Sequence, residues 1–187
     1  LHLLSRRQRQ MCIRDRATKD NRPFSSGVFD LEEFNIYTKV IDLPLDGIPT
    51  YLEEGINGVC TGGSALFNVF SNKRRVVKND LITIFPYQLA SITEISTDFA
   101  VIFFKVPKKL FMDTINGLGR LTLDYFFYMR KYYSSPLSEE EYKRFVHFCH
   151  ILSYRVDLSC AFLRRESVMY LLRVYSVSYT HLTLPTS

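Results

Sequence analysis

The chain has 187 residues, 47% of them hydrophobic, so it can bury one substantial core and is expected to form one domain. The net charge of +5 suggests a nucleic-acid partner, but residues 1–16 alone hold five arginines against one aspartate, and the central part is nearly neutral. No apolar run approaches the roughly 20 residues that span a bilayer. Without a secretory leader or CxxC spacing, the four cysteines predict reduced thiols in a cytoplasmic protein with no membrane partner.

Both ends of the chain look foreign to the rest. Met11–Arg16 and Val177–Ser187 resemble translated sequencing-adapter read-through, and the chain opens with Leu1 rather than methionine. We therefore expect residues 1–16 and 177–187 to be non-native segments outside the fold. The alternative is a basic disordered arm at one end and a polar tail at the other.

The first part of the central chain carries the signals of short strands. In chain order, strands are predicted near Asn35–Ile41, twice within Tyr51–Phe70, at Leu81–Phe85, at Leu89–Ile95 and at Phe99–Val106. Leu81–Phe85 is apolar on both faces, which predicts burial on both sides, and Pro86 ends it because proline cannot donate to a ladder. A charged turn is expected at Ser71–Arg75. Antiparallel strands this short predict a sandwich or a small barrel.

Four glycines precede that turn, at positions 55, 58, 62 and 63. Their spacing matches neither the GxxxxGK[ST] phosphate loop nor the GxGxxG fingerprint. Glycine permits positive backbone dihedrals and sharp bends, so we expect these residues to form turns at the corners of a barrel.

Beyond Val106 the periodicity becomes helical. Pro107 suits the first turn of a helix over Lys108–Asn116, and Ser138 with Glu141 forms a capping box that starts a second helix. A last helix is predicted at about Cys160–Tyr175. The two long helices carry apolar stripes, so they form a hairpin that buries either against the strands or against a second copy.

The order of these segments resembles a known family. The run that contains DLITIFP and STDFAVIFFKV, followed by LDYFFYMRKYYSSPLSEEEYKRF and RRESVMYLLRVY, is similar to the sensor domain of AraC-type transcription regulators. The resemblance covers roughly residues 24–175. It implies an α+β, mainly β fold, with a cupin-like β-barrel of the jelly-roll type at 17–106 and a C-terminal helical hairpin at 107–176.

The resemblance also implies a function, which is effector sensing and dimerisation in a transcription regulator. The chain would form a homodimer and bind a small-molecule effector, and it would reach DNA only through a C-terminal helix-turn-helix domain that is missing here. The alternative functions are a stand-alone non-metal cupin that binds or converts a small molecule, and a purely structural dimerisation module.

Many cupins hold a metal with clustered histidines and glutamates, but the four histidines here are His2, His147, His150 and His181, none in the barrel segment. We therefore predict no metal, no cofactor and no catalytic residue. The basic run at 73–75 is expected to lie in a solvated hairpin turn, and the pair at 164–165 is expected on the polar face of an amphipathic helix. The predicted ligand pocket consists of Cys60, Phe67 and Tyr87. The predicted dimer interface consists of Tyr142, Phe145, Cys149, His150 and Leu152, unless this stripe is internal core.

Overall fold

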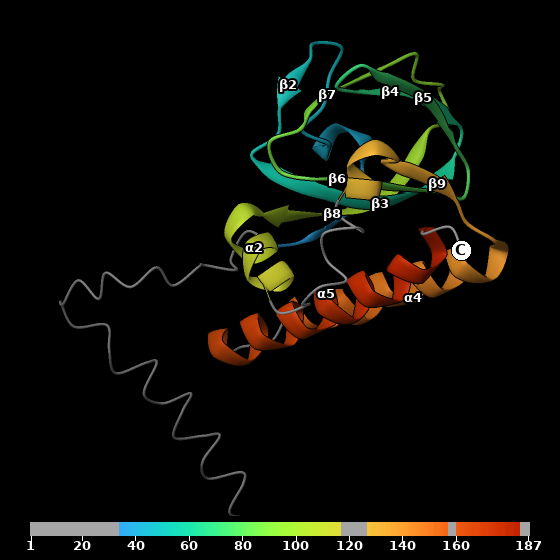
Figure 1. Ribbon diagram of the computed structural model, residues 1–187. Helices are drawn as coiled ribbons and strands as arrows, with labels where there is room; N and C mark the ends of the chain where they lie inside the picture. Colours follow the sequence, from blue (N-terminus) through green and yellow to red (C-terminus); the bar gives the residue numbers. More distant parts are fainter. Residues whose placement is uncertain (1–33, 117–126, 157–159, 184–187) are drawn as a thin grey trace, which may run out of the picture. The chain divides into compact units, whose positions relative to one another are not determined.

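Figure 1 shows the fold in a computed structural model that describes residues 34–116, 127–156 and 160–183. They belong to the second of two compact units, 31–187; the first unit, 1–30, and with it the predicted non-native segment 1–16, lies outside the described residues. The strands are β1 (Ile36–Tyr37), β2 (Thr50–Tyr51), β3 (Glu54–Gly62), β4 (Ser64–Val69), β5 (Asn72–Val77), β6 (Asp80–Ile84), β7 (Leu89–Thr93), β8 (Ala100–Pro107) and β9 (Ser134–Pro136). The helices are the 3₁₀ helix η2 (Val40–Asp42), α2 (Lys108–Asn116), α4 (Glu139–Val156) and α5 (Ala161–Thr183).

The strands form two antiparallel sheets. One has the order β1-β8-β3-β6-β9 and the other has the order β2-β7-β4-β5. The first eight strands are divided between the sheets as β1-β8-β3-β6 and β2-β7-β4-β5, which is the strand order of a jelly roll with its two Greek keys. The prediction of a mainly β fold of the jelly-roll type followed by C-terminal helices is thus confirmed. Within the described residues the two sheets stay separate, so the domain is a sandwich and not a closed barrel.

The core lies between the two sheets, because alternate side chains of each strand point to the same face. Ile56, Ile84 and Phe103 of the five-stranded sheet and Phe67 and Ile92 of the four-stranded sheet belong to one buried cluster. Every residue of β6 is buried, which confirms the predicted burial of this strand on both faces.

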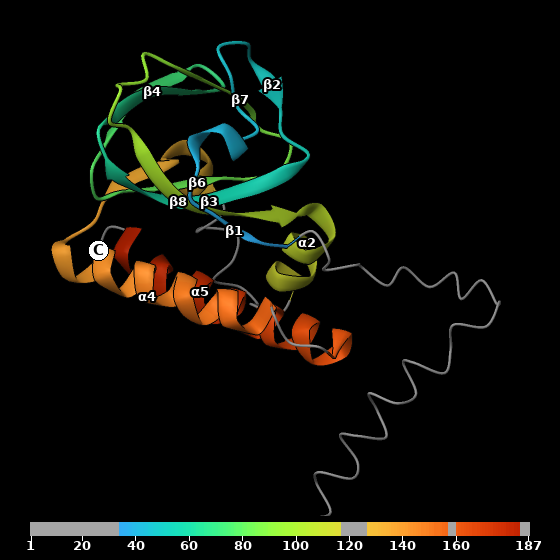
Figure 2. The ribbon, with the colours of Figure 1, turned by 180° about the vertical axis from the view of Figure 1, so that it is seen from behind.

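Helices α4 and α5 cover the outer face of the five-stranded sheet, as the two opposite views show (Figures 1 and 2). Phe104, on the outer face of β8, is the centre of this contact. Its ring centroid lies 6.4 Å from that of Phe145 on α4 and 6.0 Å from that of Tyr175 on α5. This layer of helices explains why a strand of the sheet is buried on both faces, since an uncovered sheet would show one polar face.

The segment before α4 ties the two sheets together. Tyr133 is 1% exposed, and its hydroxyl lies 3.0 Å from the carbonyl oxygens of Phe67 and Asn72 in the four-stranded sheet, where it can donate to either. Its own carbonyl accepts from the amide of Thr83 on β6, 2.8 Å away. Burial raises the pKa of the Tyr133 hydroxyl to about 12, so at neutral pH it remains a protonated donor.

The predicted helix starts agree well with the structure. Helix α2 spans Lys108–Asn116 as predicted, and the capping box before α4 is formed. The amide of Ser138 donates to Oε2 of Glu141 at 2.6 Å, and the amide of Glu141 donates to Oγ of Ser138 at 3.3 Å. The end of the last helix was predicted too early, because α5 continues through residue 183.

One strand prediction and two turn predictions need correction. Only Ile36–Tyr37 of the predicted first strand is extended, and the 3₁₀ helix η2 follows it. The charged run predicted as a solvated turn lies in the edge strand β5, where Arg74 Nη1 donates to the carbonyl of Ser134 at 2.7 Å and Arg75 pairs with Glu94. Charged residues suit an edge strand because they discourage pairing with other chains. Of the four glycines, only Gly63, with φ +62, lies in a turn, and the others belong to β3.

Candidate functional site

An open depression of about 750 Å³ lies between β2, the start of β3, the turn after β6 and the junction of β8 with α2. We call it the Tyr87 depression. Its walls combine aromatic, apolar and charged side chains, among them Pro44, Tyr51, Glu54, Tyr87, Pro107 and Lys108. A concave surface with a few polar groups among apolar walls is typical of a site for a small molecule.

The turn that carries Tyr87 is stabilised by the neighbouring chain. The amide of Gln88 donates to the carbonyl of Phe85 at 3.3 Å, and the Gln88 side-chain oxygen accepts from the amide of Phe85 at 2.7 Å. The amide of Tyr87 donates to the carbonyl of Leu52 at 2.6 Å. Tyr87 has φ 64 and follows Pro86, which places it at the turn position that glycine normally occupies.

A tyrosine in this position is costly for the fold. The left-handed backbone costs a residue with a Cβ about 1–2 kcal/mol. Burial does not offset that cost, because the Tyr87 side chain is 55% exposed. Its ring instead faces the ammonium of Lys108, which lies 4.8 Å from the ring centroid. The side chain therefore contributes more to the depression than to the core.

We expect Tyr87→Gly to raise the free energy of unfolding by about 0.5 kcal/mol, because relief of the left-handed strain exceeds the extra chain entropy of glycine. Urea denaturation measures the change. The control is Tyr51→Gly: Tyr51 is 65% exposed, lies in β2 and has no positive φ. That variant should lose about 1 kcal/mol. Equal losses in both variants would contradict the assigned strain.

The predicted pocket residues lie in two different places. Cys60 and Phe67 are 0% exposed and belong to the core between the sheets, whereas Tyr87 lines the depression. The Cys60 thiol lies 3.2 Å from the carbonyl oxygen of Gly62 and can donate to it, and burial raises its pKa, so it is a neutral core group. A ligand at Cys60 and Phe67 stays a prediction. The structure does not bring these two residues together with Tyr87.

The predicted dimer stripe is largely internal. Phe145, Cys149 and Leu152 are 0%, 4% and 0% exposed within a single chain, so for these three residues the internal-core alternative holds. Their side chains are covered because α4 packs on the five-stranded sheet and α5. Burial raises the pKa of the Cys149 thiol to about 12. Tyr142 is half-buried and His150 is exposed, so these two remain accessible to a second copy.

Sequence reasoning missed a second apolar row, on the exposed side of α5. It consists of Leu163, Tyr170, Val174 and Val177, all of which are exposed. Their spacings of seven, four and three residues are those of one helix face. This spacing is present in the sequence, but the same helix also contains the more regular apolar row with Val168 and Leu172, and only that row was identified.

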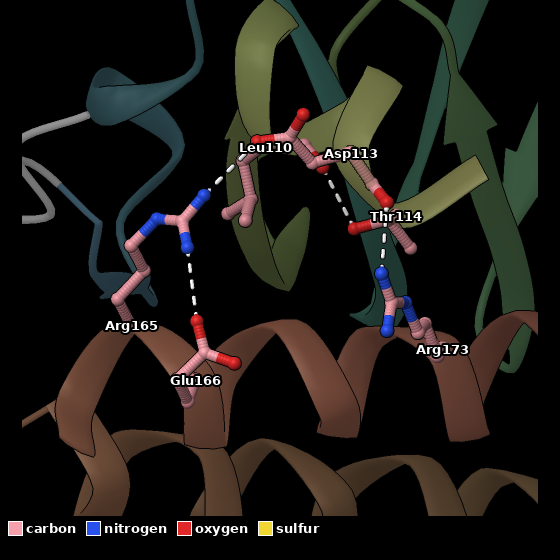
Figure 3. A network of polar contacts seen from close by, with 6 residues as sticks. All are labelled: Leu110, Asp113, Thr114, Arg165, Glu166 and Arg173. Carbon is pink, nitrogen blue, oxygen red and sulfur yellow. Dashed lines mark hydrogen bonds and ion pairs between the residues drawn. The ribbon is translucent and has the colours of Figure 1, made fainter. Parts of the chain in front are cut away.

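A polar network joins α2 to α5 (Figure 3). Arg165 Nη2 lies 3.1 Å from Asp113 Oδ2, and Arg165 Nη1 lies 2.9 Å from Glu166 Oε1. Arg173 Nη2 donates to the carbonyl of Asp113 at 3.1 Å. Arg165 was predicted on the polar face of its helix, and in the structure its half-buried side chain pairs with Asp113 of α2 and with Glu166. Helix α2 thus runs from Lys108 at the depression to a polar contact with α5.

Other kinds of site find little support in the described part of the chain. It contains no group of three or more histidine, cysteine or carboxylate residues placed to hold a metal. Its three described cysteines are free and buried, and none of the described helices is long and apolar enough to cross a membrane.

No protein-family model matches the chain, and no curated protein matches its sequence. Among solved structures it is similar to ToxT from Vibrio cholerae, with a TM-score of 0.44 and 9% identity over 81% of this chain and 57% of that chain. It is similar to the AraC-like transcriptional activator CuxR, with a TM-score of 0.25 and 16% identity over 67% of this chain and 52% of that chain. The plu4264 protein from Photorhabdus luminescens gives a TM-score of 0.30 and 16% identity, covering 48% of this chain and 88% of that one.

This chain spans little more than half the length of the ToxT and CuxR chains. At these scores and identities, the fold assignment rests on the strand order of the chain itself. That order defines a jelly-roll domain whose five-stranded sheet is covered by a C-terminal helical hairpin.

Proposed function

We propose that this chain is the effector-sensing and dimerisation domain of an AraC-type transcription regulator, in which a separate domain binds DNA. The observation that carries the proposal is the jelly roll with the helical hairpin of α4 and α5, which comes later in the chain, on its outer face. This is the architecture that the sequence resemblance to AraC-type sensor domains implies. The neutral central part of the chain also suits a domain that leaves DNA contacts to another domain.

In this proposal the effector binds in the Tyr87 depression and acts through α2. An effector shifts a conformational equilibrium only by binding one state more tightly than the other. Lys108 at the depression and Asp113 at the α5 contact lie on the same helix, so an effector that moves α2 changes its contact with Arg165 and Arg173. The alternative of a stand-alone small-molecule binder shares the depression but needs neither the hairpin surface nor a dimer.

We expect the exposed edge of α4 to contact a second copy. His147, His150 and Tyr154 lie along it at i, i+3 and i+7, and Tyr154 is 79% exposed. His150→Glu should weaken dimerisation about tenfold, because it places a charge without a partner at the interface. Sedimentation velocity over a concentration series measures the effect, and the melting temperature shows whether the monomer keeps its fold.

The matched control is Lys73→Gln, which changes the net charge by the same amount at an exposed position of β5. It should leave the dimer unchanged. If His150→Glu also leaves the dimer unchanged, the interface lies elsewhere. A wild-type protein that stays monomeric at high micromolar concentration would remove dimerisation from the proposed function.

A further inference from the structure

The walls of the Tyr87 depression favour a ligand that is both organic and cationic. Tyr51 and Tyr87 present exposed rings, and the face of an aromatic ring attracts positive charge. Pro44 and Pro107 supply apolar surface for alkyl groups. The volume of about 750 Å³ is far more than a bare metal ion needs.

The charges of the depression indicate the sign of the ligand. Glu53 and Glu54 line it, and the ion pairs found in the described part of the chain involve neither carboxylate. Lys108 is the basic lining residue, and its ammonium already lies over the Tyr87 ring. The ammonium of Lys105, the next basic group on β8, lies 4.4 Å from the Tyr37 ring centroid. The uncompensated charge in the depression is therefore negative.

Glu54 is well placed to contact such a ligand. It lies two residues before Ile56 on β3, so both side chains point to the inner face of the sheet. Glu54 is half-buried, and a partly buried carboxylate gains most from a cationic partner. Its strand neighbour Pro107 leads into α2, which places Glu54 beside the wall that carries Lys108.

We propose that the Tyr87 depression binds an organic cation of the alkylammonium class. This inference rests on the proposed effector-binding function and specifies the chemistry of the effector. The carboxylate of Glu54 provides the opposite charge, and the rings of Tyr51 and Tyr87 contact the alkyl groups around the nitrogen. The ammonium of Lys108 lies over the Tyr87 ring that the ligand would use.

The position of Lys108 makes it a competitor of the ligand. A bound cation displaces the Lys108 ammonium from the Tyr87 ring and is repelled by it, so removing the lysine charge should strengthen binding. An anion site would show the opposite sign, because Lys108 would then be its main attractive group. The sign of the Lys108→Gln effect thus separates the two ligand classes.

The test uses three probes of nearly equal shape: choline, the uncharged alcohol in which carbon replaces the choline nitrogen, and the carboxylate with the same branched alkyl group. NMR titration of the full chain follows the amides of β2, the Tyr87 turn and the start of α2. We expect choline to bind about two- to fivefold more tightly than the alcohol and to shift these amides. The carboxylate should bind more weakly than either.

Three variants complete the test. Glu54→Gln should weaken choline binding about two- to fivefold. Tyr87→Gly should weaken choline binding by a similar factor while the protein stays folded. Lys108→Gln should strengthen choline binding. Equal binding of alcohol and choline, or tighter binding of the carboxylate, would overturn the cation class and leave the effector-binding function standing. If no probe shifts the amide resonances around the depression, the proposal that this site binds an effector fails. Dimerisation is tested separately by sedimentation.

Discussion

Phe104→Ala is expected to lower the free energy of unfolding by about 3–5 kcal/mol. Phe104 is 0% exposed and lies where β8 meets both long helices. Its ring centroid is within 5.9 Å of Phe34, 6.4 Å of Phe145 and 6.0 Å of Tyr175. Removing the ring leaves a cavity among aromatic groups from three different segments, and these cannot all move inward to fill it.

Urea denaturation followed by circular dichroism measures this loss. Natural domains are stable by about 5–15 kcal/mol, so the alanine variant can be close to unfolding. The milder variant Phe104→Leu should lose about 1–2 kcal/mol and remain folded, so its loss of stability can still be measured. Phe162→Ala is the matched control, because Phe162 on α5 is 50% exposed. It should lose well under half as much as Phe104→Ala. Equal losses at the two positions would mean that α4 and α5 do not pack on β8 as described.

Gly58→Ala is the second substitution with a large expected effect, about 1–3 kcal/mol or more of lost stability. A Cβ at Gly58 would lie 2.5 Å from Cβ of Phe103 and 2.7 Å from the carbonyl oxygen of Ile102. Both contacts involve the adjacent strand β8, so β3 and β8 would have to separate at the centre of the five-stranded sheet. No side-chain rotation relieves contacts with a Cβ and a backbone oxygen.

The control for this substitution is Gly47→Ala, since a Cβ at Gly47 has no atom within 4 Å. Its stability should change by less than about 1 kcal/mol in either direction. Thermal unfolding of both variants gives the comparison. A Gly58→Ala protein as stable as Gly47→Ala would contradict the described register of β3 on β8, in which Gly58 is opposite Phe103.

Gly58 also shows why the role of a residue can depend on a partner that is distant in the sequence. Gly58 was predicted to form a barrel turn, because glycine-rich runs are usual in turns. In the structure it lies within β3 and is required by the side chain opposite it on β8. The reason for the glycine is forty-five positions further along the chain, at Phe103, and local pattern carries no information about such a partner.

The candidate site also combines a residue that the sequence identified with geometry that only the tertiary structure shows. Tyr87 was named from the sequence, but its positive φ and its position over Lys108 follow from the turn geometry and from the end of β8. The acidic pair at 53 and 54 and the second tyrosine at 51 come from a different segment. The pairing of β2 with β7 and of β3 with β6 brings them beside the Tyr87 turn. A depression formed by four separate segments cannot be recognised from any one of them.

Local features of the sequence determined the elements themselves. Alternation and continuous apolar runs predicted β6 to β8, the proline at 107 and the box from Ser138 to Glu141 marked two helix starts, and the stripe on α4 marked its buried face. These signals are local because backbone hydrogen bonds and caps form between residues a few positions apart. The tertiary structure alone decided which surface covers the α4 stripe, since a helix with an apolar face buries it equally well against its own sheet or against a second copy. Here Phe104 of the same chain fills that place, so Phe145, Cys149 and Leu152 are core, and the proposed contact with a second copy lies at the exposed edge that carries His150.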